Sequence, residues 1–214
     1  MQNDEPSAVG APSTSDPVAA PMRKRPKPGE RRVQILQALA SMLEQPGAER
    51  VTTAALAARL EVSEAALYRH FASKAQMFEG LIDFIEQSVF TLVNQIVERE
   101  GEGRDQAARI VAMVVQFAEK NPGMTRVMVG DALVFENERL QNRMNQFFDK
   151  IEATLRQVLR DAAAGDGAAA PTVDAQVRAS AITAFVVGRL QRFARSGFRR
   201  APSEHLDAAV ALML

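Results

Sequence analysis

Apolar residues recur every three or four positions through most of the chain, which is the periodicity of amphipathic α-helices. No stretch shows the two-residue alternation of a half-buried strand, and no internal repeat stands out. The pattern therefore predicts an all-α fold. Helices are expected over residues 30–45, 52–60, 63–71, 74–100, 105–120, 124–135, 137–164 and 173–196, and from 203 to the C-terminus, with a loop over 161–171.

The same spacing predicts which side chains face the core. Inward positions include Val33 in the first helix, Leu92 in helix 74–100 and Val177 in helix 173–196. Apolar stripes also take in five phenylalanines, which would fill the core of the second half of the chain: Phe117, Phe135, Phe147, Phe148 and Phe185.

Residues 52–78 carry the densest set of local signals in the chain. Thr52 and Ser63 can each cap a helix, and Ser73 with Gln76 three residues later forms a capping box. Leu67 and Phe71, four residues apart, turn one face of the second short helix inward. Two short capped helices joined by a tight turn are typical of a helix-turn-helix, whose second helix enters the major groove of DNA. A generic helical hairpin with the same caps is the structural alternative.

The turn of this motif holds an unusual residue. Glu61 precedes Val62 and Ser63, at a position where glycine is the usual choice because it takes a positive φ without penalty. We expect a left-handed glutamate here to cost on the order of 1 kcal/mol.

Composition sets limits on function. The 214 residues include 26 Lys and Arg, 26 Asp and Glu, two histidines and no cysteine, which excludes disulfides and cysteine metal sites. Ten cations face six acids over residues 22–80, whereas ten face thirteen over 81–165, so the basic surplus lies around the DNA-binding motif. The chain carries neither a Gly-rich phosphate loop nor a nucleophile spaced with a base, and we expect no enzyme, cofactor or metal.

The N-terminal segment differs from the rest. Residues 1–29 are rich in Pro, Ala and Ser and are expected to be disordered, with a basic end over 23–27 that continues to Arg31 and Arg32. Such an arm either touches DNA or is simply solvated. Neither a secretory signal nor the roughly 20 apolar residues of a membrane helix is present, so a cytoplasmic protein is expected.

The string LYRHFASK, residues 67–74, resembles the LY-x-HF-x-SK signature of TetR-family regulators. The resemblance implies a TetR-like fold: a three-helix N-terminal helix-turn-helix unit and a helical C-terminal body that dimerises. We accordingly divide the chain into the tail 1–29, a DNA-binding domain 30–90 with its motif at 52–71, and a dimerisation and partner-binding domain 91–214.

Two further segments, 81–88 and 119–160, look like the SlmA family of nucleoid occlusion factors. This resemblance implies a nucleoid-associated inhibitor of cell division. It would bind palindromic chromosomal sites and the division protein FtsZ together and disrupt FtsZ polymers. The partners implied are double-stranded DNA, FtsZ and a second copy of the chain. On DNA, one dimer or a dimer of dimers would be compatible with the resemblance. The alternative is a ligand-responsive TetR-type repressor, which needs a roomy cavity with polar anchors.

Carried over position by position, the resemblance also implies site residues. DNA contacts would come from eight positions: Thr52, Thr53, Ser63, Ala65, Ala66, Tyr68, His70 and Lys74. The FtsZ surface would include Phe84, Lys120 and Asn121, although Phe84 fits a core position equally well by spacing. Leu92 and Gln116 depart from the family pattern, which has arginine and glycine there.

The last two long helices are candidates for the dimer interface, with intramolecular packing as the alternative. Gly188 would permit close approach of another helix, and Arg189, Arg192 and Arg195 would flank the seam.

Overall fold

The computed structural model of the chain describes residues 29–45, 51–99, 101–165, 167 and 170–214, and within these ranges every regular element is a helix. The predicted all-α fold is confirmed. Residues 1–28 of the N-terminal tail, including its basic end up to Lys27, lie outside the described residues. The elements are α1 (Glu30–Leu43), α2 (Thr53–Arg59), α3 (Glu64–Tyr68), α4 (Lys74–Arg99), α5 (Gly103–Lys120), α6 (Pro122–Met128), the 3₁₀ turn η1 (Asp131–Leu133), α7 (Glu138–Gly165), α8 (Pro171–Arg195) and α9 (Leu206–Ala211).

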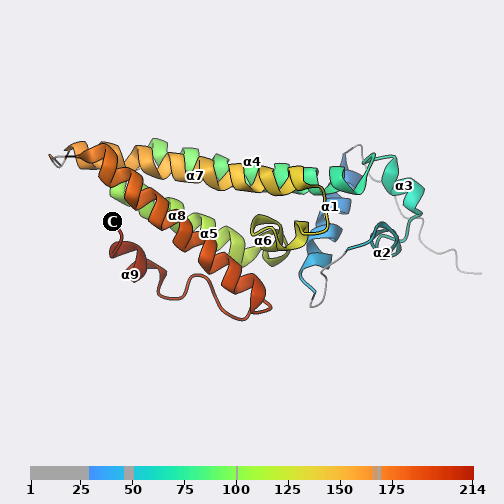
Figure 1. Cartoon of the computed structure of the whole chain (residues 1–214). Helices are drawn as coiled ribbons and strands as arrows, with labels where there is room; N and C mark the ends of the chain where they lie inside the picture. The colour runs from blue at the N-terminus through green and yellow to red at the C-terminus, as the bar shows by residue number, and fades with distance from the viewer. Residues whose placement is uncertain (1–28, 46–50, 100, 166, 168–169) are drawn as a thin grey trace, which may run out of the picture.

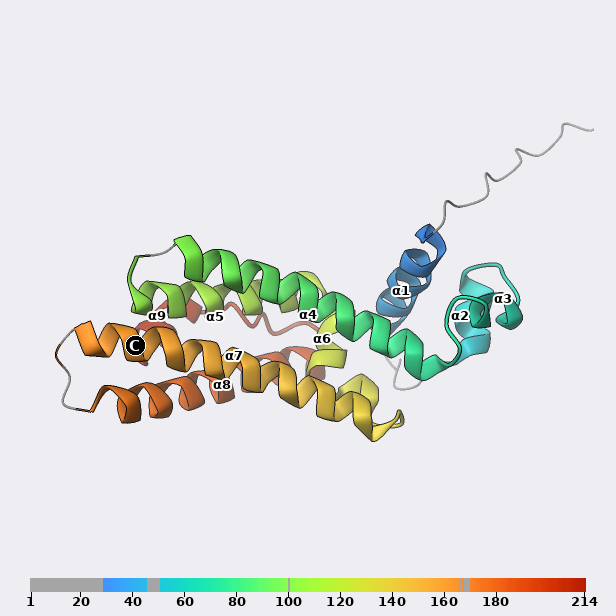
Figure 2. The ribbon, with the colours of Figure 1, turned by 90° about the horizontal axis from the view of Figure 1, so that it is seen from above.

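The molecule is elongated, with α1, α2 and α3 grouped at one end and α5 to α9 forming a body behind them (Figures 1 and 2). We call these parts the head and the body. Helix α4 belongs to both, because its 26 residues, about 39 Å of helix, begin in the head and run along the body. The predicted domain boundary at residue 90 therefore falls within one continuous helix. The most extensive packing between helices joins α7 to α8.

One continuous hydrophobic core runs from head to body. In the head, Ile35, Leu67 and Phe71 are buried, and Gly80 of α4 packs against Phe71 and the partly buried Leu36. A side chain at Gly80 would lie 3.2 Å from the Phe71 ring, so this crossing needs a small residue. The head is thereby packed onto the same helix that extends into the body.

Four apolar side chains assigned to the core lie on the surface instead. Val33 is 54% exposed, Leu92 41%, Phe135 67% and Val177 64%. Each was assigned from helical spacing, which marks a broad apolar stripe but not how much of it a neighbouring helix covers. The idea that all five phenylalanines fill the core is wrong for Phe135. Phe147 is fully buried, and the other three are partly buried.

Several predicted helix boundaries also differ from those in the structure. Helix α6 ends at Met128 rather than 135, because Gly130 takes a left-handed φ of 78° that starts a short 3₁₀ turn. The predicted helix 137–164 and the predicted loop 161–171 overlapped, and the helix is what forms there: α7 continues to Gly165, since alanine is the best helix former. The last helix starts at Leu206, after His205 with a φ of 53°.

Candidate nucleic-acid interface

Both short helices of the head begin with the predicted side-chain caps. The Ala55 amide donates to Thr52 Oγ1 at 3.1 Å, and the Ala66 amide donates to Ser63 Oγ at 3.3 Å. Each cap satisfies a backbone donor that the first helical turn leaves without a partner. The starts of α2 and α3 are therefore fixed locally, as the sequence predicted.

The turn between these helices contains the left-handed glutamate. Glu61 has a φ of 54°, which confirms the expected conformation. Two backbone hydrogen bonds close the turn: the amide of Glu61 donates to Ala58 O at 3.1 Å, and that of Val62 donates to Ala57 O at 3.0 Å. The conformation is thus held by its neighbours, whereas an isolated glutamate would disfavour it.

Helix α3 divides as predicted into a buried and an exposed face. Leu67 is 1% exposed, as is Phe71 just after the helix, whereas Ala65 is exposed and Tyr68 is 44% exposed. The other predicted DNA contacts of this segment, Ala66 and His70, are half-buried. This places a short helix with small and hydroxyl-bearing side chains at the free end of the head (Figure 1).

Thr53 is linked to the second helix. Its hydroxyl donates to Glu64 Oε2 at 2.5 Å, which joins the start of α2 to the start of α3. Six of the eight predicted DNA residues, from Thr52 to Tyr68, therefore come from this α2–α3 unit. A phosphate contact by Thr53 would have to share its hydroxyl with Glu64.

Arg32 has a role that the sequence did not reveal. Its guanidinium lies over the Phe71 ring, 4.1 Å from the centroid, and donates to the carbonyl of His70. A cation over an aromatic face is favourable by roughly 0.5–1 kcal/mol at exposed sites. Arg32 thus joins α1 to the end of α3, and the hypothesis of a free basic arm does not extend to it.

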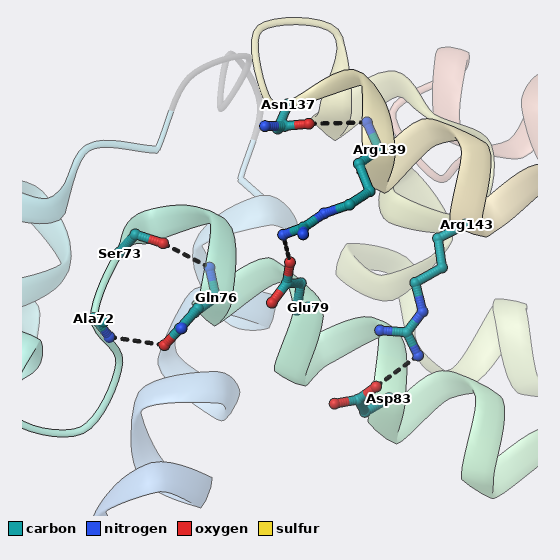
Figure 3. A network of polar contacts seen from close by, with 8 residues as sticks. All are labelled: Ala72, Ser73, Gln76, Glu79, Asp83, Asn137, Arg139 and Arg143. Carbon is teal, nitrogen blue, oxygen red and sulfur yellow. Dashed lines mark hydrogen bonds and ion pairs between the residues drawn. The ribbon is translucent and has the colours of Figure 1, made fainter.

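Helix α4 starts with the predicted capping pair. The Gln76 amide donates to Ser73 Oγ at 3.2 Å, and Gln76 Oε1 accepts from the amide of Ala72 at 2.8 Å (Figure 3). The glutamine therefore reaches one residue further back than in the usual box, where it meets the N-cap amide. The N-terminus of α4 is fixed next to the DNA-binding unit.

Lys74, the last predicted DNA contact, is already engaged in this structure. Its ammonium pairs with Glu136, which precedes α7, and the two side chains are only 26% and 11% exposed. The partners are 62 residues apart in the chain, so no local pattern predicted the pair. A DNA phosphate would have to compete with Glu136 for this lysine.

Further ion pairs continue this link along α4 and α7. Arg139 pairs with Glu79, and Arg143 donates to Asp83 and Glu86, both at 2.6 Å (Figure 3 draws the first two pairs). Partial burial of Arg143 opposes its charged form, but the hydrogen bonds and negative charges of the two carboxylates outweigh it and raise its pKa. The acids recur on one face of α4, and the two arginines lie four residues apart on one face of α7. This complementarity of charge is visible in the sequence and could have predicted that the two helices pack together.

A second joint connects the head to the body at α1 and α6. A Cβ added to Gly123 would lie 2.0 Å from Ala40 O, so the two backbones touch. Arg126, only 8% exposed, donates to Asp131 at 3.0 Å and to Leu43 O at 3.4 Å. Gly123, predicted only as part of a turn signal, is thus required for the close packing of α6 on α1.

The predicted partner residues lie on α4 and at the end of α5, two helices that also form a groove further along their length. Phe84 is 48% exposed, which rules out the core alternative, and Lys120 is also exposed. Asn121 is half-buried, and its amide donates to Phe117 O at 2.7 Å, so it caps the end of α5. Leu92 and Gln116, the two departures from the family pattern, both line a hollow of about 500 Å³ in this groove.

A larger hollow of about 550 Å³ lies between η1, α7 and α8. Its volume falls in the range of small-molecule sites. The lining includes exposed residues such as Asn145, Asp149 and Arg195, so it is a surface groove rather than an interior chamber. Within the described ranges, no three His, Cys, Asp or Glu side chains are grouped to hold a metal ion. No helix in that part of the chain is long and apolar enough to span a membrane.

The outer face of α8 is apolar and uncovered. Val173 and Val177 are 62% and 64% exposed, and Ala181 and Ala184 follow on the same face. A Cβ at Gly188 would meet no atom within 4 Å, so this glycine also faces outward. The interpretation that helix 173–196 packs only within its own chain leaves this face unexplained.

Comparison with known families matches both parts of the chain. Residues 35–81 match the model described as bacterial regulatory proteins, tetR family. Residues 105–214 match the model of a tetracyclin repressor-like C-terminal domain of the SlmA-like type.

Curated relatives are similar over most of the chain. Nucleoid occlusion factor SlmA of Photobacterium profundum is 50% identical over 182 residues, which cover 85% of this chain and 92% of the relative. Its counterpart in Vibrio cholerae is 49% identical over 184 residues, with coverage of 86% and 93%.

Solved structures show the same fold at low identity. FadR of Bacillus halodurans superposes with a TM-score of 0.70 at 15% identity, covering 88% of this chain and 96% of its own. PfmR of Thermus thermophilus, a TetR-family regulator, gives 0.68 at 21% identity, with coverage of 85% and 97%. At such identities the likeness establishes the fold alone.

Proposed function

The chain belongs to the SlmA family of nucleoid occlusion factors, and from this premise we propose that it is a DNA-associated inhibitor of cell division. It binds specific chromosomal sites through the head and disrupts FtsZ polymer assembly over the nucleoid through the body. The observation that carries the proposal is the 50% identity to a nucleoid occlusion factor over 85% of the chain, body included. A helix-turn-helix alone would not distinguish this function from gene regulation.

On DNA, α3 enters the major groove and the surrounding hydroxyls meet phosphates. Thr52, Thr53 and Ser63 would donate to the backbone from the starts of the two helices. Ala65 and Ala66 are small enough to contact a thymine methyl. Tyr68, His70 and Lys74 would complete the backbone contacts.

The assignment of Tyr68 to the backbone has its own test. A Tyr68→Ala variant loses affinity for all duplexes by a similar factor, because a phosphate contact carries no sequence information. A relaxed preference at one base pair, with affinity otherwise kept, would instead place Tyr68 on a base edge.

A homodimer brings two heads to one palindromic site, as half-site recognition requires. The exposed face of α8 is the proposed seam, because its valines and alanines would leave water on contact with a second copy. Arg192 and Arg195 are exposed near its end. Arg189 donates to the carbonyls of Pro202 and Glu204 within the same chain, so we leave it out of the proposed seam.

FtsZ is proposed to dock along the groove between α4 and α5, beginning at Phe84 and Lys120. An exposed aromatic on α4 and an exposed cation at the end of α5 suit a short apolar segment that carries an acid. Leu92 and Gln116 change the groove floor in this chain relative to the family pattern, which makes it less basic where arginine is usual. The partner segment that binds here should therefore depend more on apolar contact.

The groove assignment is testable by FtsZ binding. Phe84→Ser should reduce FtsZ binding at least tenfold, because truncation of an aromatic anchor in an interface typically costs 1.4 kcal/mol or more. Val97→Ser is the matched control, since Val97 is 38% exposed on the same helix but lies 13 residues beyond Phe84, near the other end of α4. Equal losses in both variants would exclude the groove as the docking site.

The remaining features of the proposal follow from this role. The chain acts without catalysis or a cofactor and resides in the cytoplasm on the nucleoid. A ligand-responsive repressor is the second candidate, and the hollow of about 550 Å³ is the observation in its favour. Release of DNA by a metabolite from the parent chain would support that alternative. A Met144→Trp variant, in which the larger side chain fills part of the hollow, is the control and should not respond.

A further inference from the structure

The segment that follows α8 is unusually rich in arginine. Residues 189–205 contain one acid, Glu204, and five arginines: Arg189, Arg192, Arg195, Arg199 and Arg200. Cations in the last turn of a helix stabilise its dipole, which accounts for Arg192 and Arg195. Arg199 and Arg200 lie beyond the helix end, where this explanation no longer applies.

The turn that carries these two arginines is fixed by Ser196. Its Oγ accepts from the amides of Arg199 and Arg200 at 3.1 and 3.0 Å, and its hydroxyl donates to Phe193 O at 2.8 Å. The Phe198 amide also donates to Phe193 O at 3.0 Å, and the two rings meet edge to face at 5.2 Å. The backbone that presents Arg200 is therefore held in one position.

Arginines from this segment line a small hollow of about 220 Å³. Its lining comprises Arg189, Arg192, Arg200, Ala201, Pro202, Glu204 and His205. Arg189 donates to Pro202 O at 2.9 Å and to Glu204 O at 2.6 Å, and it lies over the Phe185 ring, 4.6 Å from the centroid. Both acceptors are neutral carbonyls, so no carboxylate neutralises this guanidinium through these bonds.

The other two arginines of the hollow have no neutralising partner. Over the described part of the chain, the guanidinium groups of Arg192 and Arg200 make no ion pair. The single carboxylate on the rim, Glu204, is 64% exposed and lies 3.9 Å from His205 Nε2. Three arginines around one small volume repel one another unless an anion lies between them.

We propose that this hollow binds a small phosphate-bearing anion. The volume of the hollow is below the roughly 300 Å³ at which sites for drug-sized molecules begin, but it is large enough for several water molecules. Guanidinium groups match phosphate oxygens with paired donors, and three of them suit the two or more charges of a phosphate group. The site lies at the C-terminal end of α8, far along the chain from the helix-turn-helix and from the groove between α4 and α5.

Calorimetric titration of the full chain with inorganic pyrophosphate at low salt tests this proposal. The expected result is one pyrophosphate bound per chain. Arg200→Gln should raise the Kd about tenfold or more, since loss of one charge-assisted hydrogen bond changes an affinity by about a factor of ten. Arg200 is chosen because it lies outside α8 and its proposed seam. Arg160→Gln is the control, because Arg160 lies near the opposite end of the α7–α8 pair and is 44% exposed. Thermal unfolding verifies that both variants remain folded.

Several results would overturn the proposal. Absence of binding at millimolar pyrophosphate, or equal binding by the two variants, would remove the site. Equal affinity for sulfate at matched ionic strength would show a general anion surface rather than a phosphate site. If Arg200→Gln instead lowered the salt dependence of DNA binding, the arginines would be contacts for a DNA backbone.

Discussion

Replacement of Glu136 by glutamine should free Lys74 for DNA. The Lys74 ammonium is paired with Glu136, and both side chains are less than one-third exposed. Glutamine keeps the size of the side chain but removes the charge that holds the lysine. The variant should therefore bind DNA more tightly than the parent, and with a steeper dependence on salt.

The size of the effect follows from counterion release. Each phosphate neutralised by a lysine adds about 0.9 to the slope of log affinity against log salt on B-DNA. Two heads per dimer would add up to about 1.8, so a fourfold fall in salt concentration would raise the relative affinity of the variant about tenfold. The cost in stability should be about 1 kcal/mol or less, as for other partly exposed ion pairs.

Fluorescence anisotropy with a labelled duplex across a range of salt concentrations measures this slope directly. Glu79→Gln is the matched control: it removes an equal charge from the same interface, but the cation it frees is Arg139, on the body. An unchanged slope in Glu136→Gln would refute the argument that Lys74 is a latent phosphate contact. An equal rise of the slope in both variants would show that the change in net charge, and not the release of Lys74, causes the effect.

Three further predictions concern turn strain, head–body packing and the seam. Glu61→Gly should raise the free energy of unfolding, measured in urea, by about 1 kcal/mol. An unfolding curve with the midpoint and slope of the parent would show that the left-handed glutamate is not strained. Gly123→Ala should lower the free energy of unfolding by about 3 kcal/mol, because the new methyl would lie 2.0 Å from Ala40 O. Parent-like stability would mean that α6 can move away from α1 freely. Val177→Asp should shift the chain from dimer to monomer in sedimentation velocity, since it places a charge within the proposed apolar seam, and a dimer of parent affinity would exclude this face of α8.

The parts of the site that sequence predicted are those determined within a few residues. The caps at Thr52 and Ser63 and the left-handed turn at Glu61 depend on hydrogen bonds between residues three to five positions apart. The local spacing of residues determines such contacts, so the helix-turn-helix could be predicted without knowledge of the rest of the fold.

The contacts that join head to body were not accessible in the same way. Lys74 meets Glu136 across 62 residues, and Arg126 meets Leu43 across 83. Periodicity identifies the face of a helix that is apolar but not the helix that covers it, which is why Leu92 and Val177 were assigned to the core. Their exposure now supports surface roles for the groove and the seam.

The central claim is that the chain couples DNA binding to inhibition of FtsZ assembly. Sedimentation of FtsZ polymers in the presence of the chain, with and without a duplex taken from a chromosomal site that it occupies, tests this most directly. We expect a smaller FtsZ pellet when chain and duplex are both present, and we expect Phe84→Ser to restore the pellet. An unchanged pellet at saturating chain and duplex would contradict the account and favour a gene repressor.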